Sequence, residues 1–478
     1  MSTIPSTTSG TTDTNSILQQ AAQSILSGVT NSQLDVNSLV SALVTAKIAG
    51  QQQTISNAIQ SDNTTLSALG TMQSQLSALQ NSLSGLSDGS IFSQLSAAMS
   101  GNGITATTTT GAAAGSYSVS VQQIATANQI SSKAYASNAT LGTGNLNISV
   151  GTSTMTIALN SSNNTLSGIA SAINTASNNP GVTAAVVTAT DGQHLVLTST
   201  QTGAANTVGV SADPTVDAGM ATANFAQVAA GQDAKLTISG STVDSANNNV
   251  TNALTGVTLS LTSASVGTTQ TLSVATNTSG IVTAVQNFAT AYTAWVQTAQ
   301  QLSSYNASAA SGQQAGPLLG DAMLNSAVNG IGSIMASGIS VGGQTYSLAQ
   351  LGVNLKDDGT VNFTASTLQS TLASNPSMVS NVFNGTNGIG EQLNNFINSY
   401  TSAVTGQIAQ RQSTLNADVT TQNQAQTTLT AYQATLQAQY QAEFTQLNTI
   451  MSQTASNTSY LNQLFGGNGS AGTMNKSA

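Results

Sequence analysis

His194 is the residue that most invites a catalytic interpretation, because it is the only histidine of the chain and Asp191 lies three positions before it. A serine hydroxyl beside such a pair would form a nucleophilic triad. No nucleophile-elbow motif surrounds the pair, and Asp191-Gly192 is a dipeptide typical of tight hairpin turns. We therefore place His194 in a hairpin without a catalytic role and predict that the protein is not an enzyme.

Asp357 and Asp358 come nearest to a metal-binding pattern. A calcium loop needs several oxygen ligands at spaced positions, and two adjacent aspartates do not supply them. Gly359 follows, so a turn is the expected structure. The other acids are scattered singly, and the absence of cysteine excludes thiolate nucleophiles and cysteine metal sites. The sequence predicts no catalytic residues, no metal site and no cofactor.

The composition points to a large polar surface with little charge. The chain has 478 residues, enough for two to four domains, and only 4% of them are charged, against about 25% in an average protein. Arg411 is the only arginine. No basic track for phosphates can form, so we predict no nucleic-acid partner. No apolar run reaches the roughly 18 residues of a membrane span, so we also predict no membrane insertion.

Apolar residues recur at seven-residue spacing near both ends of the chain, in the three-then-four pattern of a coiled-coil seam. Ile450 continues the second series, which Gln422 and Glu443 interrupt. Such a stripe also suits an ordinary bundle core, and both readings stay open. Helices from opposite ends can pair only if the middle of the chain loops out. The predicted intramolecular seam comprises Leu69, Met72, Leu76, Leu79, Leu83, Ile408, Leu415, Leu429 and Leu436.

The middle of the chain, from Gly101 to about Gly280, changes to a period of two with frequent turn residues, which predicts strands. One helix is expected over residues 166–173, before Pro180. Helical periodicity returns after Gly280, and the last helical region is predicted from about Ile389 to Leu464, with a break near Asp418.

These patterns predict an α+β fold: an elongated multidomain protein in which a helical bundle or coiled coil from both termini carries inserted β-rich domains. Residues 1–45 are expected to be partly disordered. The predicted parts are a terminal leg (1–45 and 425–478), a helical bundle domain (46–112 and 278–424), an inner β domain (113–140 and 228–277) and an outer β domain (141–227).

Apolar residues near a chain end are either frayed or docked on a partner. On this ground we predict an interface with other subunits at both ends of the chain. Its residues are Asp35, Leu39, Leu43 and Ile48 in the N-terminal segment, and Tyr460, Leu461, Leu464 and Phe465 in the C-terminal one.

The order of several motifs resembles the family of the bacterial flagellar filament cap protein, also called hook-associated protein 2. The opening helix motif is similar over residues 34–40, and residues 166–210 resemble a β-rich motif shared by flagellins and hook-associated proteins. Further similar pieces are Val121-Gln122-Gln123-Ile124-Ala125, Gly231-Gln232-Asp233-Ala234, Gly256-Val257-Thr258-Leu259, Val382-Phe383, Tyr400, Arg411 and Tyr460-Leu461. Family members usually carry more charge at their helical ends, so we expect amide and hydroxyl hydrogen bonds to replace some salt bridges between subunits here.

The resemblance implies a ring, commonly of five subunits, at the distal tip of the flagellar filament, where it directs exported flagellin into the lattice and prevents its leakage. It implies secretion as an unfolded chain through the flagellar export apparatus. The implied partners are further copies of the chain, flagellin, hook-filament junction proteins and a flagellar export chaperone. Host mucin or glycans are a separate candidate partner, tied to an adhesive role of the β domains.

Two other functions remain open from the sequence. Another axial flagellar component, such as flagellin or a junction protein, has the same helix-β-helix layout, but it would polymerise or join filaments rather than form closed rings. An exported adhesin could bind host glycans through its Thr/Ser-rich β domains, and its binding would survive loss of both helical ends.

Overall fold

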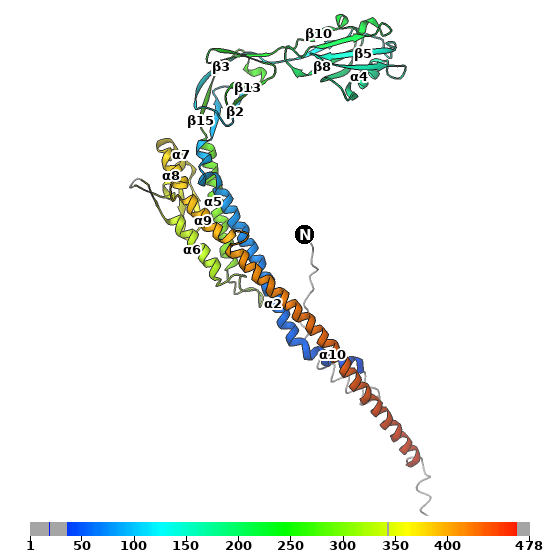
Figure 1. Ribbon diagram of the computed structural model, residues 1–478, viewed down its shortest axis with the longest axis vertical. Coiled ribbons are helices and arrows are strands. Elements are labelled where there is room, and N and C mark those ends of the chain that lie inside the picture. Colours follow the sequence, from blue (N-terminus) through cyan, green and yellow to red (C-terminus); the bar gives the residue numbers. More distant parts are fainter. Residues whose placement is uncertain (1–18, 20–35, 342–343, 466–478) are drawn as a thin grey trace, which may run out of the picture. The chain divides into compact units, whose positions relative to one another are not determined.

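A computed structural model describes residue 19, residues 36–341 and residues 344–465 of the chain. The chain folds into two compact units (Figure 1). The β unit is Gly89–Thr283, and the helical unit is formed by the residues before and after it. One insertion therefore separates the two segments of the helical unit. The predicted fold class is confirmed: an α+β multidomain protein whose helical part comes from both ends of the chain and carries inserted β-rich domains.

Two long helices dominate the helical unit. They are α2 (Val36–Ser87) and α10 (Gln407–Phe465). The heptad leucines of α2 lie on one face and are buried, which is why a helix with little charge and many polar residues is stable here. Asp35, the predicted start of this helix, lies outside the described residues, as do most of the residues assigned to the N-terminal leg.

Shorter elements complete the helical unit, and Trp295, the only tryptophan, is fully buried there. Phe288 meets Phe383 edge to face with ring centroids 5.8 Å apart. The turn predicted at Asp357 and Asp358 connects β18 to β19, which pair with each other. The elements are α5 (Thr278–Leu302), α6 (Ala322–Ala336), β16 (Ile339–Val341), β17 (Gln344–Tyr346), β18 (Val353–Leu355), β19 (Val361–Phe363), α7 (Ala365–Ser374), α8 (Pro376–Asn384) and α9 (Ile389–Thr401).

The predicted break near Asp418 is wrong, because α10 runs through this position without interruption. The Asp418 side chain is exposed, so a mid-helix carboxylate stays solvated at little cost. The chain instead turns between α9 and α10, at residues 402–406, where the N–H of Gly406 donates to the carbonyl of Ser402 at 2.9 Å.

The inner part of the β unit has two sheets around one core. The five-stranded sheet has the order β1-β15-β3-β11-β12, and the three-stranded sheet has the order β13-β14-β2. Leu236, Leu259 and Leu272 are among the buried residues between them. The strands are β1 (Leu95–Met99), β2 (Ile104–Thr108), β3 (Gly115–Gln123), β11 (Ala234–Ile238), β12 (Ser241–Ser245), β13 (Asn249–Leu254), β14 (Val257–Leu261) and β15 (Thr269–Thr276); the short helix α3 (Ser90–Ser93) precedes them.

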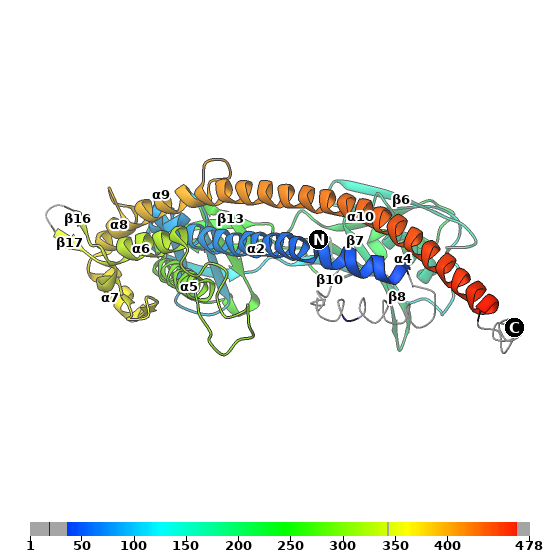
Figure 2. The same ribbon diagram turned by 90° about the horizontal axis from the view of Figure 1, so that it is seen from below.

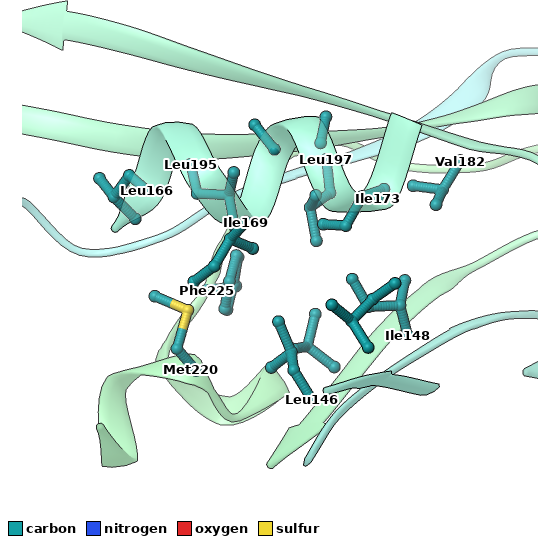
Figure 3. Packing of buried hydrophobic residues seen from close by; sticks show 14 of the residues in the cluster. Leu146, Ile148, Leu166, Ile169, Ile173, Val182, Leu195, Leu197, Met220 and Phe225 are labelled. Carbon is teal, nitrogen blue, oxygen red and sulfur yellow. The ribbon is translucent and has the colours of Figure 1, made fainter. Parts of the chain in front are cut away.

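The outer part has a four-stranded sheet, β10-β4-β8-β7, and a three-stranded sheet, β6-β5-β9. The predicted helix at residues 166–173 is α4 (Leu166–Thr175), whose start is capped by the Thr165 side chain. Figure 3 shows side chains from α4, β8 and β5 gathering in one core with Met220 and Phe225. The strands are β4 (Ala127–Ser131), β5 (Gly144–Val150), β6 (Ser153–Leu159), β7 (Val182–Ala189), β8 (Gly192–Thr202), β9 (Val208–Ala212) and β10 (Ala226–Ala229).

Three of the predicted domain boundaries need correction. Residues 95–112, assigned to the helical bundle, belong to β1, β2 and the segment after them in the inner part. The inner assignment 113–140 includes β4, and the inner assignment 228–277 includes the end of β10, yet these two strands pair with each other in the outer sheet. Strand partners lie about 100 residues apart in the sequence here, so local periodicity and turns could not assign them.

Candidate functional site

The antiparallel pair of α2 and α10 is the main candidate surface of the helical unit. The two helices run side by side in both views (Figure 1, Figure 2). The Gln441 side-chain amide donates to Asn37 at 3.0 Å near the start of α2. Near the end of α2, the Gln80 amide donates to Asn394 on α9 at 2.7 Å. Uncharged amide pairs therefore link α2 to α10 at one end and to α9 at the other.

The residues assigned to the intramolecular seam lie on these helices with different degrees of burial. The five α2 residues, Leu69, Met72, Leu76, Leu79 and Leu83, are fully buried. Ile408 is buried too, and Leu429 and Leu436 are 7% exposed. Leu415 is half-buried. Leu429 and Leu436 join one apolar cluster with Val40, Val44 and Ile48 of α2.

Close backbone contact between α2 and α9 depends on a glycine. A Cβ atom added to Gly390, in the first turn of α9, would lie 2.9 Å from the Ser87 Cβ and 2.6 Å from the Phe383 carbonyl oxygen. Real Cβ atoms do not come that near to such atoms. Gly390 therefore lets the start of α9 pack directly on the end of α2.

Within the described chain, the predicted subunit-interface residues of the N-terminal segment lie against α10. Leu39 and Ile48 are 1% and 2% exposed. Leu39 packs with Phe444 of α10 and with the half-buried Leu43, and Ile48 belongs to the cluster with Leu429. Asp35 lies outside the described residues. These leucines and isoleucine hold the two terminal helices together, whatever further contact the segment makes.

The predicted interface residues of the C-terminal segment lie on the far end of α10 and are exposed. Tyr460, Leu461 and Leu464 have exposed fractions of 62%, 51% and 53%. Phe465 ends the helix, and its side chain lies outside the described part. The residues of α10 beyond Gln441, 442–465, span about 36 Å at about 1.5 Å per residue. The described part of α2 begins near Gln441, so it cannot cover this length.

The sequence analysis missed part of this exposed surface. Leu447 and Ile450 are 43% and 52% exposed. Ile450 continues the heptad series of α10 but is not among the residues assigned to the seam, and described α2 offers no residue opposite it. The exposure of these two side chains depends on how far α2 overlaps α10, and heptad spacing does not predict the extent of that overlap.

One ion pair fixes the buried end of α10. Arg411 contacts Asp321, whose side chain is only 10% exposed and also accepts a hydrogen bond from the Leu324 N–H at 3.0 Å. Asp321 thereby caps α6 and ties its start to the first turns of α10. The single arginine of the chain acts as a structural clamp in the helical unit.

His194 lies on β8, beside the β7–β8 turn, and both of its ring nitrogens have hydrogen-bond partners. Its Nδ1 atom is 2.7 Å from the Ser132 carbonyl oxygen, and its Nε2 atom is 3.0 Å from Asp191 Oδ1. The Ser132 carbonyl, and secondly Asp191, raise the pKa of His194. The Ser132 hydroxyl donates to the Lys133 carbonyl and accepts from the Leu195 N–H. These groups hold a hairpin and do not form a nucleophilic triad.

The Asp357-Asp358 pair forms a turn, as its sequence predicted. Asp358 accepts hydrogen bonds from the N–H and hydroxyl of Thr360 at 2.9 and 2.6 Å, which lowers the pKa of Asp358. Across the described residues, no three His, Cys, Asp or Glu side chains cluster in a way that could hold a metal ion. In the same part of the chain, no helix has the length and apolar character of a membrane span.

The geometry thus defines a multidomain protein that presents an apolar helix end and β domains. Comparison with known proteins gives its family. The family model described as "Flagellar hook-associated protein 2 N-terminus" matches residues 32–128, and the one described as "Flagellar hook-associated protein 2 C-terminus" matches residues 231–456. Residues 129–230, which hold most of the outer β part, lie between the two matched regions.

Two curated relatives extend over nearly the whole chain. Flagellar hook-associated protein 2 of Escherichia coli (strain K12) is 32% identical over 463 residues, which cover 91% of this chain and 97% of the relative. The B-type flagellar hook-associated protein 2 of Pseudomonas aeruginosa is 28% identical over 442 residues, with 87% and 92% covered.

A solved structure agrees with these relatives. The crystal structure of the D1-D2-D3 domains of the flagellar cap protein FliD from Escherichia coli matches with a TM-score of 0.55 and 29% identity, covering 73% of this chain and 99% of that one. The chain belongs to the flagellar hook-associated protein 2 family, as its motifs predicted.

Proposed function

We propose that this protein caps the flagellar filament: it forms a ring at the distal tip, promotes ordered polymerisation of flagellin and prevents flagellin from leaking away. The observation that carries the proposal is the match along nearly the whole chain to hook-associated protein 2, together with the fold shared with a flagellar cap protein. The ring would be a homo-oligomer, with five subunits as the expected number.

The far end of α10 is the part that we assign to the filament. Its exposed apolar side chains lie between Leu447 and Leu464. Binding to another surface would remove them from water and so lower the free energy of the system. Asp35, Phe465 and the rest of both terminal segments would extend this leg. Leu39 and Ile48 then act by holding α2 on α10, so that the leg is anchored in the helical unit.

A leg of this kind suits a cap that must move as the filament grows. The described far end of α10 carries apolar, hydroxyl and amide side chains and only one charge beyond Gln441, on Glu443. Contacts without strong ion pairs can be broken and remade as each flagellin subunit is added. Export through the flagellar apparatus, with a chaperone, and contact with junction proteins belong to the same proposal. No catalytic step belongs to it.

The decisive experiment is deletion of the gene followed by complementation with truncated chains. The deletion strain should release unpolymerised flagellin into the medium, and the full chain should restore filaments. A chain lacking residues 452–478 should fold but fail to restore them. A chain lacking only residues 470–478 keeps the exposed apolar residues Tyr460, Leu461 and Leu464, so as the control it should restore filaments at least in part. Normal filaments with the longer truncation would refute the assignment of the leg.

The oligomer formed by the purified protein separates this function from that of other axial components. Electron microscopy and mass measurement should show closed rings whose size does not increase with concentration. Open fibres that lengthen with concentration would point to a filament subunit instead.

A further inference from the structure

The outer part of the β unit has sheet edges that need protection from other chains. β7 lies at one edge of the four-stranded sheet, and β6 and β9 are the edges of the three-stranded one. An edge strand presents unpaired N–H and C=O groups that invite another extended chain, and proteins often block such edges with lysine or other charges. β7 reads Val-Thr-Ala-Ala-Val-Val-Thr-Ala, with no charge and no proline. Such a sequence is prone to pair with other strands.

Two asparagine side chains cover half of the β7 edge. The Thr200 N–H donates to the Gly181 carbonyl, so the backbone N–H and C=O groups of every second residue from Gly181 point toward β8. The backbone groups of Val182 and Ala184 therefore point away from β8, toward the open edge. The Asn174 amide donates to the Ala184 carbonyl at 2.7 Å and its oxygen accepts from the Ala184 N–H at 2.9 Å. Asn179 makes the same paired contact with Val182, at 2.8 Å for both bonds.

The β9 edge has the same arrangement with different residues. The Gly151 N–H donates to the Thr207 carbonyl, so the backbone N–H and C=O groups of Val208 and Val210 point away from β5. The Thr222 hydroxyl accepts from the Val210 N–H at 2.6 Å and donates to the Val210 carbonyl at 2.7 Å. The buried Asn128 accepts from the Val208 N–H at 2.8 Å.

The third edge, β6, has one such contact. Its register with β5 leaves the carbonyl of Ala158 on the outward side, and the Asn163 amide donates to it at 3.0 Å. Three edge strands in one domain thus have outward backbone groups bound by asparagine or threonine side chains. A side-chain amide that uses its oxygen and one of its N–H groups makes the same two hydrogen bonds to a strand residue that a neighbouring strand would make.

We propose that Asn174, Asn179 and Thr222 are edge guards: by occupying both outward groups of a strand residue, they prevent a further extended chain from pairing with β7 or β9. They replace the charged residues that block edges in most proteins, which this chain scarcely has. The guards confine association of the outer part to side-chain surfaces. Val187 lies in the half of β7 nearer the β7–β8 turn, beyond the residues that the two guards bind, and its side chain is 48% exposed.

The test uses the full chain with Asn174→Ala. Asn174→Ala removes both hydrogen bonds to Ala184, and hydrogen exchange at the Ala184 amide should speed up about tenfold because its N–H loses the Asn174 acceptor. It should also produce assemblies larger than those of the unaltered chain, which grow with concentration in analytical ultracentrifugation and show the circular dichroism of added β-structure. Asn147→Ala is the matched control, because Asn147 lies on the central strand β5 and its amide oxygen binds only the Thr156 hydroxyl.

Two further variants separate edge pairing from simple destabilisation. Asn174→Asp breaks only the bond to the Ala184 carbonyl, because a carboxylate oxygen still accepts from the Ala184 N–H, and it leaves a charge at the edge. The Ala184 amide should therefore stay protected from exchange in this variant, and no larger assemblies should form. Val187→Lys, added to Asn174→Ala, should abolish the larger assemblies. The proposal is overturned if Asn174→Ala keeps the original size distribution while Ala184 exchanges faster, or if Asn174→Asp associates as strongly. Should Asn174→Ala fail to fold, Thr222→Val applies the same test to β9.

Discussion

The two parts of α10 have similar polar compositions and opposite surroundings. In the part before Gln441, Ile408, Leu429 and Leu436 are buried against the rest of the helical unit. In the part after it, Leu461 and Leu464 are more than half exposed. One helix therefore serves as core at one end and as free surface at the other. The spacing of apolar residues predicts which face of a helix is apolar, and the overlap with a partner helix determines whether that face is buried.

The largest difference between the two parts should appear when matched leucines are truncated. We expect Leu436→Ala to lower the free energy of unfolding of the helical unit by about 2–3 kcal/mol, because it leaves a cavity in the cluster with α2. Urea unfolding followed by circular dichroism at 222 nm measures this change. Leu461→Ala is the matched control, and an equal loss for both variants would contradict the comparison.

The helical unit that covers the buried part of α10 contains a close contact between α9 and the end of α2, which can be tested with two glycines. Gly390→Ala should destabilise the helical unit by about 1–3 kcal/mol, because its Cβ has no room beside Ser87. Gly70→Ala has no atom within 4 Å of its Cβ and should stabilise α2 by about 1 kcal/mol. Fluorescence of Trp295, buried in the same unit, reports both changes. A stabilising effect of Gly390→Ala would show that α9 does not pack directly on the end of α2.

The anchoring of α10 by Arg411 should have a smaller effect. Arg411→Met leaves Asp321 largely buried without its cation, and because the arginine is about one-third exposed we expect a loss of about 1–2 kcal/mol. Thermal unfolding monitored by Trp295 measures it. The double variant Arg411→Met with Asp321→Asn should recover part of the loss, since the asparagine still caps α6; an additive loss would mean that the two residues act independently.

The smallest effect on stability should come from the exposed part, where the effect on function should be the greatest. Leu461→Ser with Leu464→Ser should change the free energy of unfolding by no more than about 0.5 kcal/mol, because both side chains are already in water. The same variant should fail to retain flagellin in the complementation assay. If this variant caps filaments as well as the unaltered chain, the far end of α10 is not the surface that contacts the filament.

Several local features of the fold could be predicted from the sequence because they depend on neighbours in the chain. The Asp191-Gly192 hairpin and the helix from Leu166 follow from turn chemistry and short-range apolar spacing. The α2 residues from Leu69 to Leu83 show their burial through a regular repeat.

Other features could not be predicted because they depend on distant residues. β4 and β10 pair across about 100 residues, so nothing local assigns them to the outer sheet. The exposure of Ile450 depends on how far α2 overlaps α10. Asn174 and Asn179 look like ordinary polar surface residues until the register of β7 shows which backbone groups point outward.

The continuity of α10 has a mechanical consequence. The helix contains no glycine or proline from Gln407 to Phe465, and its 59 residues span about 88 Å at about 1.5 Å per residue. A push or twist applied at Leu464 is therefore carried by an unbroken ladder of backbone hydrogen bonds to Ile408 in the bundle. A hinge at Asp418 would have absorbed that load, whereas this stiff shaft delivers it to the turn at residues 402–406.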